Sequence, residues 1–202
     1  MALTLIDMPT VPSAPQTVEW TINDIVATNI SPFSGQQQTQ DWQAGWLEAS
    51  ISMPPLTHVQ AQAWVAFLMQ CRGQVSAFLF GDPLAVAPQG SGSGTPLVNG
   101  SSQSGFSLAT KGWTAGASRV LLPGDWVQVG QRIYRVLTAA SADGSGNATL
   151  SIWPQLRESP ADGDAITLNN TRGAFRLKSN SRKFSITEAR FYGFQFEIRE
   201  AI

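Results

Sequence analysis

The stretch MPPLTHVQAQAWVAFLMQCRGQVSAFLFGDP, residues 53–83, decides the fold. It predicts one helix over residues 57–72 and a buried strand over residues 75–80. Thr57 suits the N-cap, Gln60 completes a capping box three residues later, and Gly73 suits a left-handed residue after the last turn. We expect the buried stripe of the helix to consist of the apolar residues at helical spacing, Val59, Ala63, Trp64, Ala66, Phe67, Leu68 and Cys71.

A single amphipathic helix needs a sheet to cover, and both ends of the chain predict strands. Residues 18–30 read as one or two strands with a possible turn at Asn23-Asp24, and residues 31–41 as a polar loop. Residues 42–53 alternate as a strand, and residues 174–177, 183–187 and 192–202 form a final meander. Phe194, Phe196 and Ile198 share one face of the last strand, and we expect the helix to pack on them.

The segment between these strands has a different composition. Residues 88–105 are rich in Gly and Ser and predict a flexible connection. Short strands at 119–122, 126–129, 133–137 and 148–153, separated by turn residues, then predict a small barrel or a compact antiparallel sheet. The predicted fold is therefore mainly β: a β-sandwich with one packed α-helix, formed by residues 1–85 and 172–202, and an inserted β-barrel-like domain, residues 86–171.

Composition and charge favour association. Hydrophobic residues make up 43% of the 202 residues, enough for a core, but charged residues only 13% against roughly 25% in typical soluble domains. Other subunits could cover much of the surface, or the surface could be neutral and rich in Ser, Thr, Gln and Gly. Residues 1–110 carry six acids and one base, Arg72, whereas residues 172–190 carry six bases and one acid, Glu188. Blocks of opposite sign favour self-association; nucleic-acid binding and a merely solvated basic strand are the alternatives.

The residues that carry catalysis or bind metals are few. His58 is the only histidine and Cys71 the only cysteine, so neither a nucleophile–histidine pair nor a zinc site is expected. Residues 143–147 and 162–164 read as surface turns, and GSGSG at 90–94 lacks the Lys and Ser/Thr of a phosphate-binding loop. The sequence predicts no enzyme, no cofactor and no metal. Neither a signal peptide nor a membrane-spanning run is evident, which predicts a soluble product of a reducing compartment.

The chain contains seven tryptophans, of which Trp20 and Trp64 are interpreted as core residues. Three others, Trp113, Trp126 and Trp153, lie in the predicted insertion. They could fill the barrel core, form a subunit contact, or present a platform on which a sugar stacks. The first two interpretations are the simpler ones.

Three segments carry a resemblance to known proteins. The segment AWVAFL…RGQ…FLFGDP, within residues 63–83, and the final strand FYGFQFEIREAI make the chain similar to distal tail proteins of long, non-contractile-tailed bacteriophages. The stretch PGDWVQVGQRIYRVL…DGSGNATLSIWPQLR, residues 123–157, is similar to the inserted module of related tail-tip proteins. No catalytic motif is part of the resemblance.

The resemblance implies a structural protein of the virion, made in the cytoplasm of the bacterial host. Such proteins form a hexameric ring at the tail tip that joins the tail tube protein to the baseplate hub, and their outward module can carry fibres or receptor-binding proteins. No membrane and no specific nucleic acid are expected as partners. The alternative function is a carbohydrate-binding adhesin module of the tail tip. A cell-envelope hydrolase is disfavoured because the histidine and carboxylate pairs are missing.

Overall fold

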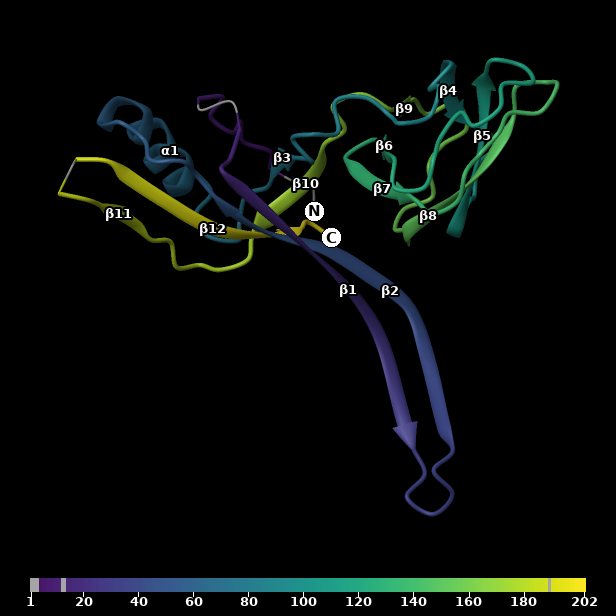
Figure 1. Cartoon of the computed structure of the whole chain (residues 1–202), viewed down its shortest axis with the longest axis horizontal. Helices are drawn as coiled ribbons and strands as arrows, with labels where there is room; N and C mark the ends of the chain where they lie inside the picture. Colours follow the sequence, from purple (N-terminus) through teal and green to yellow (C-terminus); the bar gives the residue numbers. More distant parts are fainter. Residues whose placement is uncertain (1–3, 12–13, 189) are drawn as a thin grey trace. The chain divides into compact units, whose positions relative to one another are not determined.

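Two antiparallel sheets and one helix make up the computed structural model, which describes residues 4–11, 14–188 and 190–202 (Figure 1). The fold is mainly β, as predicted. The chain divides into a first unit, Met1–Thr21, Leu47–Leu84 and Asn170–Ile202, and a second unit, Ile22–Trp46 and Ala85–Asn169. The predicted domain boundaries remain a prediction, and this division differs from them by grouping Ile22–Trp46 with the second unit.

The first sheet has the order β1-β2-β12-β10-β3, with β11 paired to β12, and it belongs to the first unit except for the distal parts of β1 and β2, residues 22–46. Its strands are β1 Thr17–Ile30, β2 Gln37–Ser52, β3 Phe78–Phe80, β10 Gly173–Leu177, β11 Phe184–Ile186 and β12 Tyr192–Glu200. The strand β12 lies between β2, where Ile51 opposes Phe196, and β10, where Leu177 opposes Ile198. The first and last segments of the chain thus supply the sheet that the helix covers.

The helix α1, His58–Gln70, packs on this sheet through aromatic side chains. The ring of Phe67 meets Trp64 edge-on at 5.8 Å and Phe78 of β3 at 5.1 Å, and Trp64 lies 6.1 Å from Phe196. On β1, Trp20 continues the cluster to Phe80 and Phe175. The predicted burial of Phe194, Phe196 and Ile198 is confirmed, and the contact of Phe196 with Trp64 places the helix on this face of β12.

The ends of the helix agree with the sequence signals more closely than its buried face does. The backbone N–H of Thr57 donates to Oε1 of Gln60 at 3.1 Å, as the capping box requires. Beyond the C-cap Cys71, the backbone turns left-handed already at Arg72, with φ 50°, one residue before Gly73. The buried side chains are Ala61, Trp64, Phe67, Leu68 and Cys71.

The predicted stripe was therefore wrong at three positions. Val59 is 82% exposed, and Ala63 and Ala66 are also exposed. The helix α1 has no Asp, Glu, Lys or Arg to mark its exposed face. Apolar spacing alone therefore predicted a buried stripe that is too wide. The following strand was also predicted too long: Val75 is exposed and β3 begins only at Phe78.

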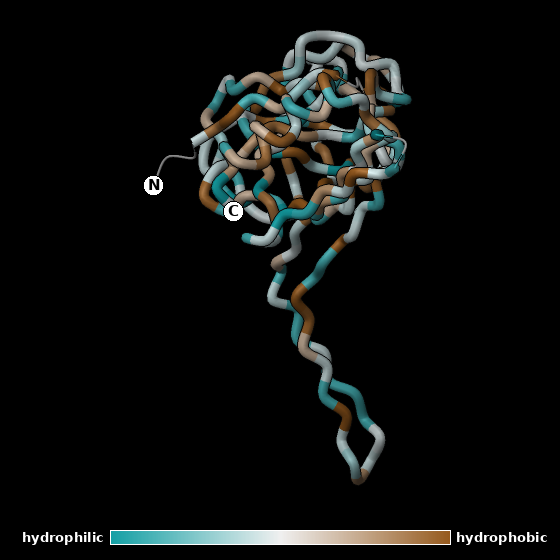
Figure 2. Tube along the Cα trace, turned by 90° about the vertical axis from the view of Figure 1, so that its left-hand side faces the viewer, coloured by the Kyte–Doolittle hydropathy of each residue, from teal (hydrophilic) through white to brown (hydrophobic). Residues whose placement is uncertain are grey.

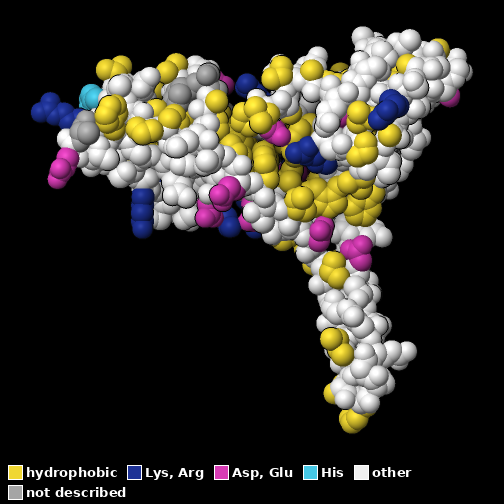
Figure 3. Space-filling model, viewed as in Figure 1, with side chains coloured by type: hydrophobic (Ala, Val, Ile, Leu, Met, Phe, Trp, Pro, Cys, Tyr) yellow, Lys and Arg dark blue, Asp and Glu magenta, His cyan; other side chains and the backbone are white. Residues whose placement is uncertain are grey.

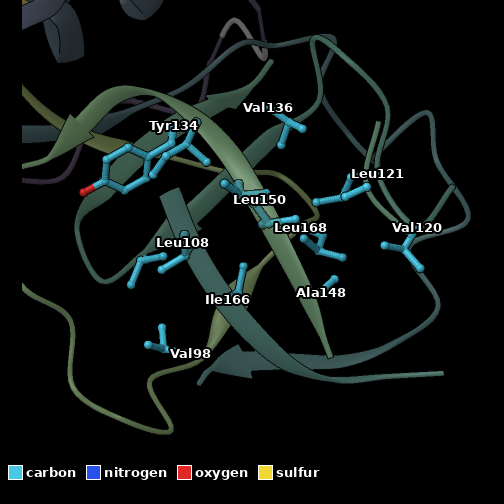
Figure 4. Packing of buried hydrophobic residues seen from close by; sticks show 14 of the residues in the cluster. Val98, Leu108, Val120, Leu121, Tyr134, Val136, Ala148, Leu150, Ile166 and Leu168 are labelled. Carbon is cyan, nitrogen blue, oxygen red and sulfur yellow. The ribbon is translucent and has the colours of Figure 1, made fainter. Parts of the chain in front are cut away.

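The second unit contains a barrel-like sheet in the order β4-β5-β8-β7-β6-β9. Its strands are β4 Gly94–Val98, β5 Gly105–Trp113, β6 Trp126–Val129, β7 Arg132–Val136, β8 Ala148–Leu156 and β9 Ile166–Thr167. An antiparallel bridge between Leu97 and Ala165 joins the two edges, so the sheet closes on itself. Its interior is filled by aliphatic side chains such as Leu108, Leu150 and Ile166 (Figure 4).

The glycine- and serine-rich entry to this barrel is ordered rather than flexible. The buried carboxylate of Asp125 accepts the backbone N–H groups of Gln89 at 2.7 Å, Gly90 at 3.2 Å and Leu122 at 2.8 Å. Strand β4 then begins at Gly94. The prediction of a flexible connection over residues 88–105 was wrong because composition does not reveal a distant carboxylate that binds the backbone.

The strands β1 and β2 form a hairpin longer than the sequence suggested (Figure 1). The predicted turn at Asn23-Asp24 lies inside β1, and the predicted loop over residues 31–41 contracts to residues 31–36. The backbone N–H of Ser31 donates to the carbonyl of Gln36 at 2.9 Å, which closes the turn. The glutamine-rich segment that follows is part of β2.

Candidate interaction surface

The distal half of the β1–β2 hairpin, residues 22–46, carries apolar side chains that no other element covers. Phe33 at the turn is 99% exposed, Ile22 64% and Trp42 63%. Ile25, Val26 and Ile30 are exposed as well. Figure 2 shows hydrophobic positions along both strands of the hairpin, and Figure 3 shows hydrophobic side chains on the hairpin surface. A group of exposed large apolar side chains on one element indicates an interaction surface.

The backbone of this distal half also lacks a third strand. Among the described residues, β12 pairs with β2 only from Glu48 to Ser52. The strand order ends at β1, so among the described residues no strand pairs with either edge of the distal hairpin, although the guanidinium of Arg157 donates to the carbonyl of Gly45 on β2. An isolated two-stranded ribbon is marginally stable in water, and an open edge pairs readily with another strand. The distal hairpin is therefore a candidate for pairing with another strand.

The charge of the hairpin has one sign. Its strands carry Glu19, Asp24, Asp41 and Glu48, and the sequence has no Lys or Arg before Arg72. Asp41 is exposed, and its carboxylate accepts the backbone N–H of Gln43 at 2.7 Å. Gln43 has φ 53°, an unusual left-handed value within a strand. A partner for the distal hairpin should therefore be apolar and basic.

Part of the basic segment at residues 172–190 is already used within the first unit. Lys178 forms ion pairs with Glu48 at 2.9 Å and with Glu197 at 3.2 Å. The hydrogen bonds that the ammonium of Lys178 donates to the carboxylates of Glu48 and Glu197 raise the pKa of Lys178. Lys178 therefore joins β2 and β12 of the same chain. Only the other cations of the basic segment are left for the predicted contact with an acidic neighbour.

The structure does not bring the candidate catalytic residues together. His58 is exposed at the start of α1, where its Nδ1 lies 3.0 Å from the hydroxyl of Tyr192, whereas Cys71 is buried at the other end of the helix. The described residues contain no group of three or more His, Cys, Asp or Glu side chains that could hold a metal ion. That the protein is not an enzyme remains a prediction from the sequence.

The acidic turns have structural partners. Lys111 donates to Asp162 at 2.6 Å, and this bond, with the backbone N–H of Gly100, holds the pKa of Asp162 below its usual range. Asp143 accepts the backbone N–H groups of Asn147 and Ser145, both at 2.8 Å, and these bonds lower its pKa. Both carboxylates stabilise turns of the second unit.

The three tryptophans of the predicted insertion, Trp113, Trp126 and Trp153, do not form an exposed platform. Trp113 and Trp126 are buried, which agrees with the interpretation as barrel core. The indole N–H of Trp113 donates to the hydroxyl of Thr110 at 2.7 Å, and the guanidinium of Arg135 lies 3.9 Å from the centre of a Trp126 ring. Neither ring face is available for a sugar to stack on. Trp153 is half-buried and donates to Asp24 at 2.9 Å.

The environment of Cys71 predicts an unreactive thiol. Burial raises the pKa of Cys71 from 9.0 to about 11, although nearby Arg182 acts in the opposite direction. Two pKa units reduce the thiolate fraction near neutral pH about 100-fold. We expect Ellman's reagent at pH 8 to label the native protein at least about 100-fold more slowly than the protein in denaturant. Labelling at equal rates would contradict this assignment.

The same shift gives a direction for stability against pH. Below pH 9 the thiol is protonated in both the folded and the unfolded chain, so it contributes no pH dependence. Between pH 9 and about 11 only the unfolded thiol ionises. This contribution therefore lowers the free energy of unfolding as the pH rises through that window.

The distal hairpin is the functional feature that sequence reasoning missed. Its polar, glutamine-rich second strand resembles a loop, and its first strand alternates only loosely. One signal was present: residues 16–31 contain neither Gly nor Pro, and Pro32 and Gly35 mark a single turn. This placement of Gly and Pro predicts two long strands joined by one turn.

In the described part of the chain, no helix is both long and apolar enough to cross a membrane. No protein-family model matches the chain, and no curated protein sequence is significantly similar to it.

Proposed function

We propose that the protein is a structural subunit of a bacteriophage tail tip, which assembles through its β1–β2 hairpin into a ring between the tail tube and the baseplate hub. The observation that carries self-assembly is the distal hairpin, with its exposed Ile22, Phe33 and Trp42 and its two open edges. The place in a phage tail is supported by the resemblance of residues 63–83 and 123–157 to tail-tip proteins. The low charged fraction, 13%, agrees with a surface that other subunits cover.

Assembly through one repeated contact follows from the physics of the open strand. A strand that gains main-chain hydrogen bonds and apolar burial from a neighbour is more stable in the assembly than alone. A ring meets this need for every copy at once, because each subunit both gives and receives the contact. The tail tube protein, the hub and outer fibres or receptor-binding proteins would bind the completed ring.

The test is the mass of the purified full chain, by light scattering after size-exclusion chromatography, together with negative-stain images. One copy weighs 21.7 kDa, so six copies would weigh about 130 kDa, six times that mass. We expect rings with a central hole. A chain that remains at 21.7 kDa at every concentration would overturn the proposal.

A triple variant tests the role of the hairpin. Ile22, Val26 and Ile30 lie four residues apart in β1 and therefore share one face, because side chains of a strand alternate between its two faces. Changing them to Thr preserves strand propensity while removing apolar surface. Full burial of such a side chain is worth roughly 1.5–3 kcal/mol, so we expect assembly to weaken by about a thousandfold or more.

The matched control is Leu84→Thr/Val86→Thr, which removes two exposed apolar side chains outside the hairpin, 91% and 58% exposed. This control should assemble as the wild type does. Equal assembly of the hairpin variant and the wild type would show that the hairpin is not the contact.

A further inference from the structure

The β11–β12 hairpin of the first unit presents a second unusual surface, which we define as the β11 edge: Arg182, Lys183, Phe184, Ser185, Ile186 and Arg190. All six side chains are exposed, with Phe184 at 48% and Ile186 at 59%. Among the described strands, β11 pairs only with β12. Its outer edge is therefore open along an apolar strand.

The apolar part of the β11 edge is held in a fixed geometry. The ring of Phe184 stacks on Tyr192 at 6.3 Å, with 25° between the planes, and lies 5.9 Å from Phe194. Beside it runs an open groove of about 830 Å³, lined by residues of β11, of β12 and of the serine-rich segment at 179–185. An aromatic anchor next to a groove is a surface to which an extended segment can bind.

The β11 edge also carries positive charge that is not compensated within the described chain. Lys178 binds Glu48 and Glu197, but no ion pair is formed by Arg182, Lys183 or Arg190 among the described residues. Open edge strands are usually protected against pairing by charges, bulges or a covering element. Here the three cations flank an apolar strand, which favours a partner that is both apolar and acidic.

The distal hairpin of a second copy has these properties. It exposes Ile22, Ile30 and Trp42, carries the carboxylates Asp24 and Asp41, and has no cation. Both elements have open strand edges, so they can share main-chain hydrogen bonds. Opposite charges on two different surfaces of one chain favour contacts between copies and disfavour contacts between identical surfaces.

We propose that the β11 edge of one copy receives the distal β1–β2 hairpin of the next copy, a step that rests on the proposed ring function. Because donor and receiver are different surfaces, the contact is head-to-tail. Head-to-tail contacts form a closed ring when the rotation between copies closes, and an open filament when it does not. The cations Arg182 and Lys183 then fix the register against the acidic hairpin.

Charge reversal with complementation tests this contact. A receiver variant, Arg182→Glu/Lys183→Glu, and a donor variant, Asp24→Lys/Asp41→Lys, each place like charges at every interface of a homogeneous ring. We expect each alone to raise the midpoint concentration of assembly at low salt by about tenfold or more, and about 1 M salt to reduce this effect. An equimolar mixture should assemble as well as the wild type, because alternating copies pair opposite charges at every contact.

Circular dichroism and a thermal melt establish that each variant is folded before mixing. A second measurement is independent of charge: Ile186→Cys and Thr28→Cys chains, mixed and treated with a short bis-maleimide, should form covalent dimers that neither chain forms alone. Buried Cys71 keeps the background low.

The results separate two failures. A wild-type chain that never assembles overturns the proposed function. The second failure needs a wild type that assembles. If the receiver variant then assembles equally well, or if the mixture does not recover assembly, the proposed ring is retained and the assignment of the β11 edge is overturned.

Discussion

Phe67→Ala is expected to lower the free energy of unfolding by about 3–5 kcal/mol, the usual cost of removing a buried aromatic ring. Phe67 is buried and joins Trp64 to Phe78, so its loss interrupts the aromatic cluster between α1 and the sheet. Alanine preserves helix propensity, and the loss therefore reports packing alone. Urea denaturation followed by tryptophan fluorescence measures it, since Trp64 lies at the altered site.

Met69→Ala on the same helix is the matched control. Met69 is exposed, and its removal should change the free energy of unfolding by no more than about 0.5 kcal/mol. Similar losses in the two variants would mean that the buried face of α1 is assigned incorrectly.

Asp125→Ala is expected to destabilise the second unit by about 2–4 kcal/mol. Its carboxylate accepts three backbone N–H groups, and hydrogen bonds to a charged group contribute about 1.5–3 kcal/mol each when the donors are shielded from water. The three donors are partly accessible, which reduces the sum. Removing the side chain frees the segment at residues 88–92 from the barrel, so hydrogen exchange should increase there first.

Asp125→Asn separates shape from charge. It retains one oxygen, but its amide must face a backbone N–H, so we expect a loss between zero and that of the alanine variant. Asp41→Ala, on the exposed hairpin, serves as the control for removing a carboxylate. An alanine variant as stable as the wild type would exclude Asp125 as the anchor of the entry segment.

The sequence anticipated those elements whose signals are local. The caps Thr57 and Gln60 fixed where the helix begins, and strict alternation identified β12 with its buried Phe194, Phe196 and Ile198. Turn residues at 123–125 and 143–147 separated the strands of the barrel. Each signal depends on neighbours a few residues away, and a pattern of that range can be recognised without the fold.

Features that depend on distant partners could not be predicted. The serine- and glycine-rich entry is ordered by Asp125, about 35 residues away, which composition does not reveal. The predicted stripe of α1 was too wide because Val59, Ala63 and Ala66 also have helical spacing, and only the position of the sheet distinguishes them from the buried Ala61. For the candidate surface, the sign of the charge in each segment was evident, but not that Lys178 is used within the chain.

The sequence by itself determined a mainly β chain with one helix, an acidic first half, a basic segment near the end and few residues suited to catalysis. Tertiary structure decided which of these features remain at the surface. Residues 53–83 supply the helix and β3, but the strands that cover them come from both ends of the chain. The distal half of the hairpin and the outer edge of β11 stay open because no other strand of the described chain pairs with them. Strand pairing between distant segments is the property that local sequence patterns do not specify.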